Sequence, residues 1–335
     1  MSAACAALSV AALLSPARAR AFPWPVKPFH RQHPIRANFG DPRMVFDNGL
    51  YDDGIDGPVR FRFHNGVDIA APDGTPVYAV ISGIVKKIDD QALAIVGVGR
   101  SIDYFHIDPL VVDGQHVKAL RTVLGFIAKG FGHVHLGELR GGRIWNPLAK
   151  GGLAPYHDVT TPTVRAIYIR RWNTLGLLSP NDVCGRVSIV ADAFDSQPVP
   201  VPGKWHGFPL APALLTWSVH RVGTTRRLAA ASGKVDFRTT LPPARDFWKV
   251  YARGTYQNGP RFGRQQYIMP GLFLYQLTPR SLDTEKLRNG RYRVVVRAED
   301  LSGNTGVLIE RFRVDNDPMR PSGCSVTTPP TSYKP

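Results

Sequence analysis

The sequence predicts an all-β protein built from two units of antiparallel sheet. Glycine and proline are abundant, at 32 and 29 of the 335 residues, which suits a chain rich in turns and short strands. Apolar runs of strand length recur along the chain, and none shows the sustained 3.6-residue periodicity of an amphipathic helix. The length and the 43% hydrophobic composition allow two domains with substantial cores.

The first 21 residues have the pattern of an export signal. Residues 5–14 form an apolar run of h-region length, and Ala17, Ala19 and Ala21 offer small-x-small cleavage sites. No Lys or Arg precedes the run, which leaves open a start further upstream. The run is too short to span a bilayer as a stable helix. We therefore expect residues 1–21 to be a signal peptide and the mature chain, without a transmembrane segment, to lie in the periplasm, in the cell wall or outside the cell.

A linker is predicted near residues 150–155, where two glycines and a proline occur together. Before it, a Pro-rich N-terminal segment (22–35) leads into a predicted domain over residues 36–150. That domain contains short β-type runs separated by Gly and Pro, at residues 76–88, 92–98 and 101–107. We expect mostly antiparallel strands there.

Beyond the linker, residues 155–316 contain five runs that alternate apolar and polar side chains, as in a β-sandwich. The last two runs, joined by a Gly-Asn turn, resemble the final strands of bacterial immunoglobulin-like domains. Residues 236–270 exceed the length of a sandwich loop and are expected to form an elaboration. Residues 317–335 are predicted to be a disordered tail.

The net charge of +16 restricts the partners of the protein. Loss of residues 1–21 would remove Arg18 and Arg20 and no acidic residue, leaving +14. Such a surface suits nucleic acid or an anionic cell envelope. The absence of a nucleic-acid motif and the export signal favour anionic wall polymers, although simple solvation of Lys and Arg would give the same charge.

Only two cysteines, Cys184 and Cys324, follow the predicted signal peptide. They could form one disulfide in an oxidising compartment or remain as two free thiols, and neither has zinc-knuckle spacing.

Four residues have the spacing of metal ligands. His133 and His135 lie two apart and would point to the same face of a strand. His64 and Asp68 share parity, with an Asn-Gly pair between them that allows a kink. Two imidazoles and a carboxylate suit zinc, although each motif alone is more often an ordinary surface feature.

The sequence around these residues resembles the lysostaphin/LytM-type zinc endopeptidases of bacterial cell walls. The run HNGVDIAAPDGTPVYAVISGIV is similar to the first signature of that family. The run DYFHIDPLVVDGQHVKALRTVLGFIAKGFGHVHLGELR is similar to its second half, and Asn38–Arg43 to its first strand. The resemblance covers residues 36–150 and implies an antiparallel barrel-sandwich hybrid.

The resemblance implies a role for each of five residues. His64, Asp68 and His135 would bind one Zn²⁺ per chain, and His106 and His133 would be catalytic histidines outside the ligand set. No HExxH motif supplies a glutamate base, so the histidines would move the proton. Tyr104 is a candidate cleft-edge or oxyanion residue, with ordinary strand packing as the alternative.

Several further residues have less certain roles. Asp103 and Glu138 are candidate hydrogen-bond partners of a ligand imidazole. Trp205 and Trp248 are candidates for a sugar-binding face on the second domain, whereas Trp217 lies in an alternating run and is expected in the core.

The resulting prediction is an exported zinc metalloendopeptidase that hydrolyses cross-links or stem peptides of peptidoglycan. The alternative is a non-catalytic LytM-type regulator or wall-binding scaffold that activates another wall hydrolase. No family ligand is missing from this chain, which favours the enzyme.

Overall fold

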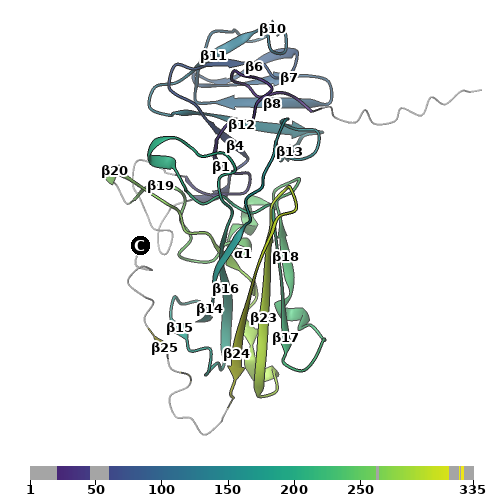
Figure 1. The fold of residues 1–335 in the computed structure, drawn as a ribbon, viewed down its shortest axis with the longest axis vertical. Coiled ribbons are helices and arrows are strands. Elements are labelled where there is room, and N and C mark those ends of the chain that lie inside the picture. The colour runs from purple at the N-terminus through teal and green to yellow at the C-terminus, as the bar shows by residue number, and fades with distance from the viewer. Residues whose placement is uncertain (1–20, 46–59, 262–263, 317–323, 325, 328–335) are drawn as a thin grey trace, which may run out of the picture.

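The computed structural model describes residues 21–45, 60–261, 264–316, 324 and 326–327. The predicted signal peptide lies outside this part of the chain, apart from Ala21. Within the described residues, no helix has the length and hydropathy needed to cross a bilayer. The fold is all-β with antiparallel sheets, as predicted, and forms two β regions stacked end to end (Figure 1).

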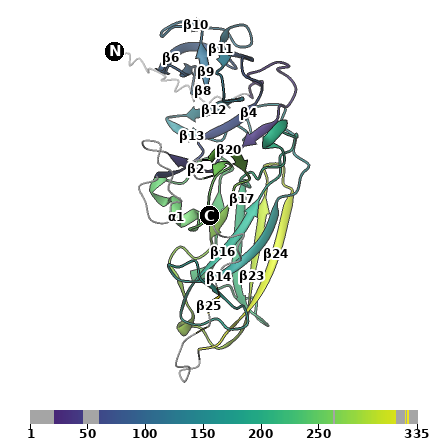
Figure 2. The ribbon, with the colours of Figure 1, turned by 90° about the vertical axis from the view of Figure 1, so that its left-hand side faces the viewer.

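The first β region is centred on one large sheet whose pairings are antiparallel. Its path is β1 (Ile35–Ala37), β4 (Gly66–Ala70), β12 (His133–Arg140), β8 (Arg100–Phe105), β7 (Ala92–Val96), β6 (Gly83–Asp89) and β10 (His116–Val117), and β13 (Arg143–Trp145) pairs with β12. A smaller sheet contains β5 (Pro76–Tyr78), β11 (Val123–Ile127) and β9 (Ile107–Pro109). The hairpin of β2 (Pro42–Val45) and β3 (Arg60–Phe63) lies toward the second region (Figure 2).

The second β region contains two sheets that pack face to face. One has β21 (Leu274–Gln276), β16 (Arg186–Phe194), β14 (Thr163–Arg171), β15 (Leu177–Leu178) and β25 (Val326–Thr327) in order, with β22 (Leu282–Asp283) on β16. The other has β18 (Gly233–Asp236), β17 (Leu214–Arg221), β23 (Gly290–Glu299) and β24 (Thr305–Val314). The long strands β14, β16, β23 and β24 run side by side along this region (Figures 1 and 2). Assignment of this region to the immunoglobulin-like class stays a prediction.

Short elements fill the junction and the edges. The predicted elaboration contains α1 (Phe247–Val250) and the hairpin of β19 (Gly259–Arg261) and β20 (Arg264–Met269). Four 3-10 turns complete the described elements: η1 (Gly203–Trp205), η2 (Ala229–Ala231), η3 (Ala244–Asp246) and η4 (Thr284–Lys286). Figure 1 shows β19 and β20 beside β1, although these segments are far apart in the sequence.

The two β regions share one hydrophobic core across their junction. Phe63 of β3 is 4% exposed and packs against Phe237, Phe247 and Tyr251, with ring centroids 5.8, 5.2 and 6.0 Å away. The Tyr251 hydroxyl donates a 2.7 Å hydrogen bond to the Gly40 carbonyl. Because these contacts are buried, the regions are not independent units on a flexible linker.

The Pro-rich N-terminal segment is also part of the folded structure. Trp24 is fully buried, and its indole N–H donates a 2.8 Å hydrogen bond to the Pro155 carbonyl. Phe22 forms a parallel bridge with Leu153. The N-terminal segment and the predicted linker therefore pack together and stabilise each other.

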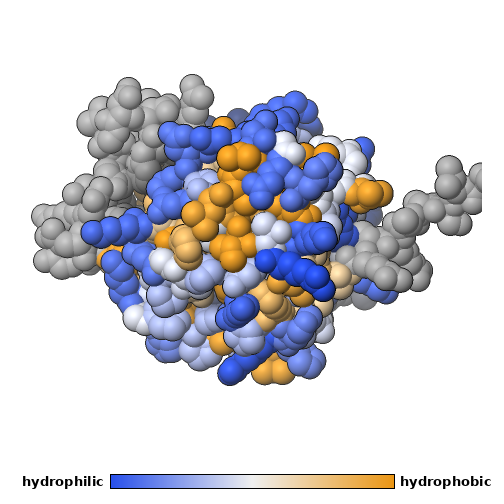
Figure 3. Space-filling view, turned by 90° about the horizontal axis from the view of Figure 1, so that it is seen from above, coloured by the Kyte–Doolittle hydropathy of each residue, from blue (hydrophilic) through white to orange (hydrophobic). Residues whose placement is uncertain are grey.

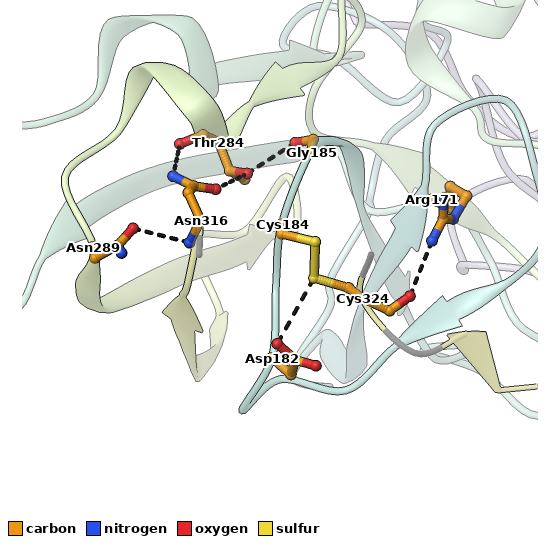
Figure 4. Close-up of a disulfide and its surroundings, with 8 residues drawn as sticks. All are labelled: Arg171, Asp182, Cys184, Gly185, Thr284, Asn289, Asn316 and Cys324. Carbon is orange, nitrogen blue, oxygen red and sulfur yellow. Dashed lines mark hydrogen bonds between the residues drawn. A yellow bond between two sulfur atoms is a disulfide. The ribbon is translucent and has the colours of Figure 1, made fainter. Parts of the chain in front are cut away.

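Cys184 and Cys324 form a disulfide, which resolves the alternatives left by the sequence (Figure 4). The Cys324 carbonyl accepts a 2.9 Å hydrogen bond from the Arg171 guanidinium. The next described residues, Val326–Thr327, pair with β15. The predicted disordered tail is therefore wrong at these positions, because a covalent bond and a strand pairing fix them; the rest of residues 317–335 lies outside the described residues.

The end of the molecule farthest from the second region has a mixed surface. Figure 3 looks onto this end and shows apolar side chains gathered among hydrophilic ones. Exposed apolar residues on its strands and loops include Ile84, Ile88, Leu110, Val112 and Phe126.

Candidate metal centre

Two neighbouring strands bring the predicted ligands together. β12 pairs with β4 so that His135 lies directly opposite Asp68. His64 ends the segment before β4, and Gly66 lets that segment approach β12 closely. A Cβ at Gly66 would collide with the Leu136 carbonyl oxygen and lie 2.7 Å from His135 Nε2. Only glycine therefore fits at position 66 without moving β4 and β12 apart.

Three ligand atoms form a small triangle. His64 Nε2 lies 2.8 Å from His135 Nδ1, and both atoms lie 3.1 Å from Asp68 Oδ1. All three side chains are buried. Zinc binds tetrahedrally with bonds of roughly 2.0–2.2 Å, so its ligand atoms are about 3.3 Å apart. The described side chains therefore fit three corners of a zinc tetrahedron.

The hydrogen bond of His64 sets its tautomer. His64 Nδ1 lies 2.8 Å from the Asn38 carbonyl oxygen, which can only accept, so Nδ1 carries the proton. The neutral ring then presents the lone pair of Nε2 to the triangle. Burial, with the charge of Arg43 nearby, lowers the pKa of His64 to about 3, so the ring is neutral at neutral pH, as a metal ligand must be.

Two arginines hold the second oxygen of Asp68. Arg43 Nη2 donates a 2.6 Å hydrogen bond to Oδ2, and Arg36 Nε lies 3.8 Å from the same atom. Burial alone would raise the pKa of Asp68, but His133, His64 and Arg43 outweigh it and hold the pKa well below the usual range. Asp68 therefore stays ionised and offers Oδ1 as a single ligand atom.

His106 and His133 lie beside the triangle. Their ring centroids are 4.7 Å apart, and His106 stacks on Phe131 at 4.2 Å. His133 Nδ1 donates a 2.8 Å hydrogen bond to the Phe131 carbonyl, which leaves Nε2 as an acceptor. Burial is the main cause that lowers the pKa of both rings, to about 4 for His106. Both rings are therefore neutral and can accept a proton.

Tyr104 does not reach this site, which corrects its prediction as a cleft-edge residue. It is fully buried on β8, and its hydroxyl accepts a 2.9 Å hydrogen bond from the Val80 N–H. His106 has φ +65° at the end of this strand, so the regular alternation stops before it. The imidazole turns into the cleft, whereas Tyr104 keeps the core-facing side it shares with Leu136.

Glu138 also differs from its predicted role as a partner of a ligand imidazole. It is fully buried and binds Arg140 through hydrogen bonds of 2.6 and 3.0 Å, with Arg100 3.3 Å away. Asp103 hydrogen-bonds Ser101 and also interacts electrostatically with the ligand His135. The His64 and His133 imidazoles are oriented by the backbone carbonyls of Asn38 and Phe131, which residue types alone do not reveal.

A second buried carboxylate group lies in the second β region. Asp158, Asp195 and Asp300 bring one oxygen each within 4.8 Å of one another. Burial and the neighbouring Asp158 raise the pKa of Asp195 to about 8. A proton on Asp195 thus relieves the repulsion among the three carboxyls.

The comparison with protein families agrees with this geometry. Residues 62–142 match the model of peptidase family M23. This M23 domain contains the described ligand triangle and both neighbouring histidines. The matched segment ends before the second β region begins.

Solved structures similar to this chain include three bacterial proteins. A zinc-containing peptidase from Vibrio cholerae is 29% identical, with 37% of this chain and 38% of that chain covered and a TM-score of 0.28. The catalytic domain of lysostaphin from Staphylococcus simulans is 23% identical (29% and 80% covered, TM-score 0.22). The catalytic domain of the prophage-encoded M23 protein EnpA from Enterococcus faecalis, solved as a point mutant, is 26% identical (34% and 86% covered, TM-score 0.22). The chain thus spans little more than a third of the Vibrio protein, and no curated protein matches it.

Proposed function

We propose that this protein is an exported zinc metalloendopeptidase that hydrolyses peptide bonds in peptidoglycan cross-links or stem peptides. The observation that carries the proposal is the triangle of His64 Nε2, Asp68 Oδ1 and His135 Nδ1 with His106 and His133 at its side. Three nitrogen and oxygen ligands with one open position are typical of catalytic rather than structural zinc.

Each side chain has a distinct task in this proposal. A zinc ion held by the three ligands would supply hydroxide at neutral pH and polarise the scissile carbonyl. His133 Nε2 carries the lone pair that would accept a proton, because Nδ1–H is donated to the Phe131 carbonyl; in the structure Arg36 Nη2 lies 3.5 Å from this Nε2. His106 lies next to His133, and the proton that these histidines accept from the water would be returned to the leaving amine. Arg43 helps to keep Asp68 ionised and binds its Oδ2, so that Oδ1 faces His64 and His135.

Two further observations support an envelope location. The Cys184–Cys324 disulfide is typical of an oxidising compartment. The net charge, +16 for the full sequence and +14 without residues 1–21, suits binding to anionic wall polymers.

The test is incubation of the purified protein with isolated peptidoglycan, followed by mass spectrometry of the released muropeptides. We expect the wild-type protein to release peptide fragments and to contain one zinc ion per chain. Asp68→Asn should lose both the metal and the activity. His106→Ala should retain zinc but lose at least about 100-fold in rate, as expected for a general acid–base residue.

His116→Ala is the matched control, because His116 is exposed on β10, away from the cleft. It should behave as wild type. Zinc binding without release of any fragment would favour the non-catalytic regulator. Equal activity of Asp68→Asn and wild type would refute the metallopeptidase.

A further inference from the structure

The cleft that contains the metal centre has two walls, and the second β region builds one of them. The cleft measures about 670 Å³. Arg36, Arg43 and Arg62 line it from β1, β2 and β3. Lys204 and Trp205 of η1 and the start of β19 line it from the second β region. The M23 domain therefore does not form the substrate cleft alone.

Buried hydrogen bonds hold the second wall in place. Asn258, just before β19, is 4% exposed; its side chain donates 2.7 Å to the Pro209 carbonyl and accepts 2.7 Å from the Gly271 N–H. The Gln197 side chain donates 2.8 Å to the Trp205 carbonyl. The Arg36 guanidinium lies 4.2 Å from the centroid of the Trp205 ring, so it joins the two walls.

The charges along the cleft are strongly unbalanced. Four cationic side chains line it, Arg36, Arg43, Arg62 and Lys204, against one carboxylate, Asp68. Arg43 is paired with Asp68, and Arg36 is held by Trp205 and by the Phe131 carbonyl, 3.0 Å from Nη1.

Arg62 and Lys204 remain available for a ligand. Both are exposed, and neither has an ion pair with a carboxylate among the described residues. Although Arg62 is exposed at the surface, partial desolvation within the cleft and the charge of Arg43 lower its pKa, which is the direction expected where repulsion from another cation is not offset by an anion.

We infer that this cleft binds a peptide with a free carboxylate beside the scissile bond, and that Arg62 and Lys204 are the residues that recognise it. The inference rests on the proposed peptidase function and adds the charge of the substrate. A carboxylate bound between two cationic side chains in the cleft would accept charge-assisted hydrogen bonds, and a neutral amide in its place cannot form bonds of that strength.

The test compares one muropeptide in two forms, before and after its carboxylates are converted to amides with carbodiimide and ammonia. Cleavage is followed as kcat/KM. Binding is followed separately with chelator-treated protein, through the fluorescence change of Trp205. Trp205→Phe shows how much of the signal comes from this ring.

We expect wild-type protein to prefer the carboxylate form by about 10- to 100-fold in both readouts, as for hydrogen bonds to charged groups. Lys204→Ala and Arg62→Gln should each reduce this preference, and Lys204→Glu should abolish it. Lys86→Ala on β6 is the control, because it removes an exposed cation far from the cleft, and it should leave the preference unchanged.

The two readouts separate failure of the inference from failure of the proposed function. A carboxylate preference in binding without any cleavage would refute the peptidase and keep the anionic subsite. Equal binding and cleavage of both forms by wild type, or an unchanged preference in Lys204→Glu and Arg62→Gln, would overturn the inference.

Discussion

Replacement of Phe63 by alanine tests whether the two β regions unfold as one unit. Phe63 is 4% exposed and contacts three aromatic rings of the second region. Truncation of such a side chain costs about 3–5 kcal/mol, because burial is lost and a cavity remains. With an unfolding entropy of about 2.1 cal/mol/K per residue over about 300 residues, this cost lowers the Tm by about 5–8 °C.

The assay is differential scanning calorimetry of the wild-type protein, of Phe63→Ala and of the control Phe126→Ala. Phe126 is 37% exposed on β11 at the far end of the first region, so its loss should shift the Tm by less than about 2 °C. We expect one transition for each protein, with the whole transition shifted in Phe63→Ala. Two separate transitions in wild type, or a shift no larger than that of the control, would refute the shared core.

Three further predictions follow from described contacts. Gly66→Ala should destabilise the protein by about 2 kcal/mol or more and weaken zinc binding, because its Cβ would collide with the Leu136 backbone carbonyl of β12. Denaturation and zinc titrations measure the two effects. Gly137→Ala is the control and should be tolerated, because the atom nearest to its Cβ lies 3.5 Å away. The pKa of Asp195 is raised to about 8 in the folded state, so the folded protein holds this proton more tightly than the unfolded chain. The stability that the protonated Asp195 contributes is fully present below about pH 4 and is lost as the pH rises to 8. Asp195→Asn should therefore equal wild type at pH 4 and exceed it at pH 8 by on the order of a few kcal/mol, and urea unfolding that shows the same difference at both pH values would contradict this. Cys184→Ser should lose up to about 5 kcal/mol, because the disulfide closes a loop with a sequence separation of 140; a reductant should lower the Tm of wild type and leave the variant unchanged.

Strand parity identified four candidate ligands in the sequence, and the family resemblance selected His64, Asp68 and His135 among them. The alternation of β12 directs the side chains of His133 and His135 to one face, and Gly66 lets β4 approach β12 closely. The structure thereby brings His64, Asp68 and His135 together. The catalytic roles of the neighbouring histidines remain proposals. Of the two alternatives for Tyr104, ordinary strand packing holds, because its side chain is fully buried and the left-handed backbone at His106 turns only the histidine toward the cleft.

Contacts between distant segments could not be predicted from local patterns. Trp205 was a candidate for a sugar-binding face, yet it lines the cleft beside the candidate metal ligands, and the Arg36 guanidinium lies over its ring. Trp217 is 8% exposed and packs in the core, as expected. The difference arises because Trp217 sits in a regular strand, whereas the position of Trp205 depends on a loop held by buried side chains such as Gln197.

The shared junction also determines when the protein can fold. The Ala211 N–H hydrogen-bonds Asp41, and the Tyr251 hydroxyl hydrogen-bonds Gly40, so early and late parts of the chain meet in one buried layer. Such pairings form slowly, because a long stretch of chain must be ordered before they contribute. A nascent chain that lacks η1 and β19 has no complete cleft, however much of the first β region has been made. Delayed completion would keep the cleft from forming until most of the polypeptide has been synthesised.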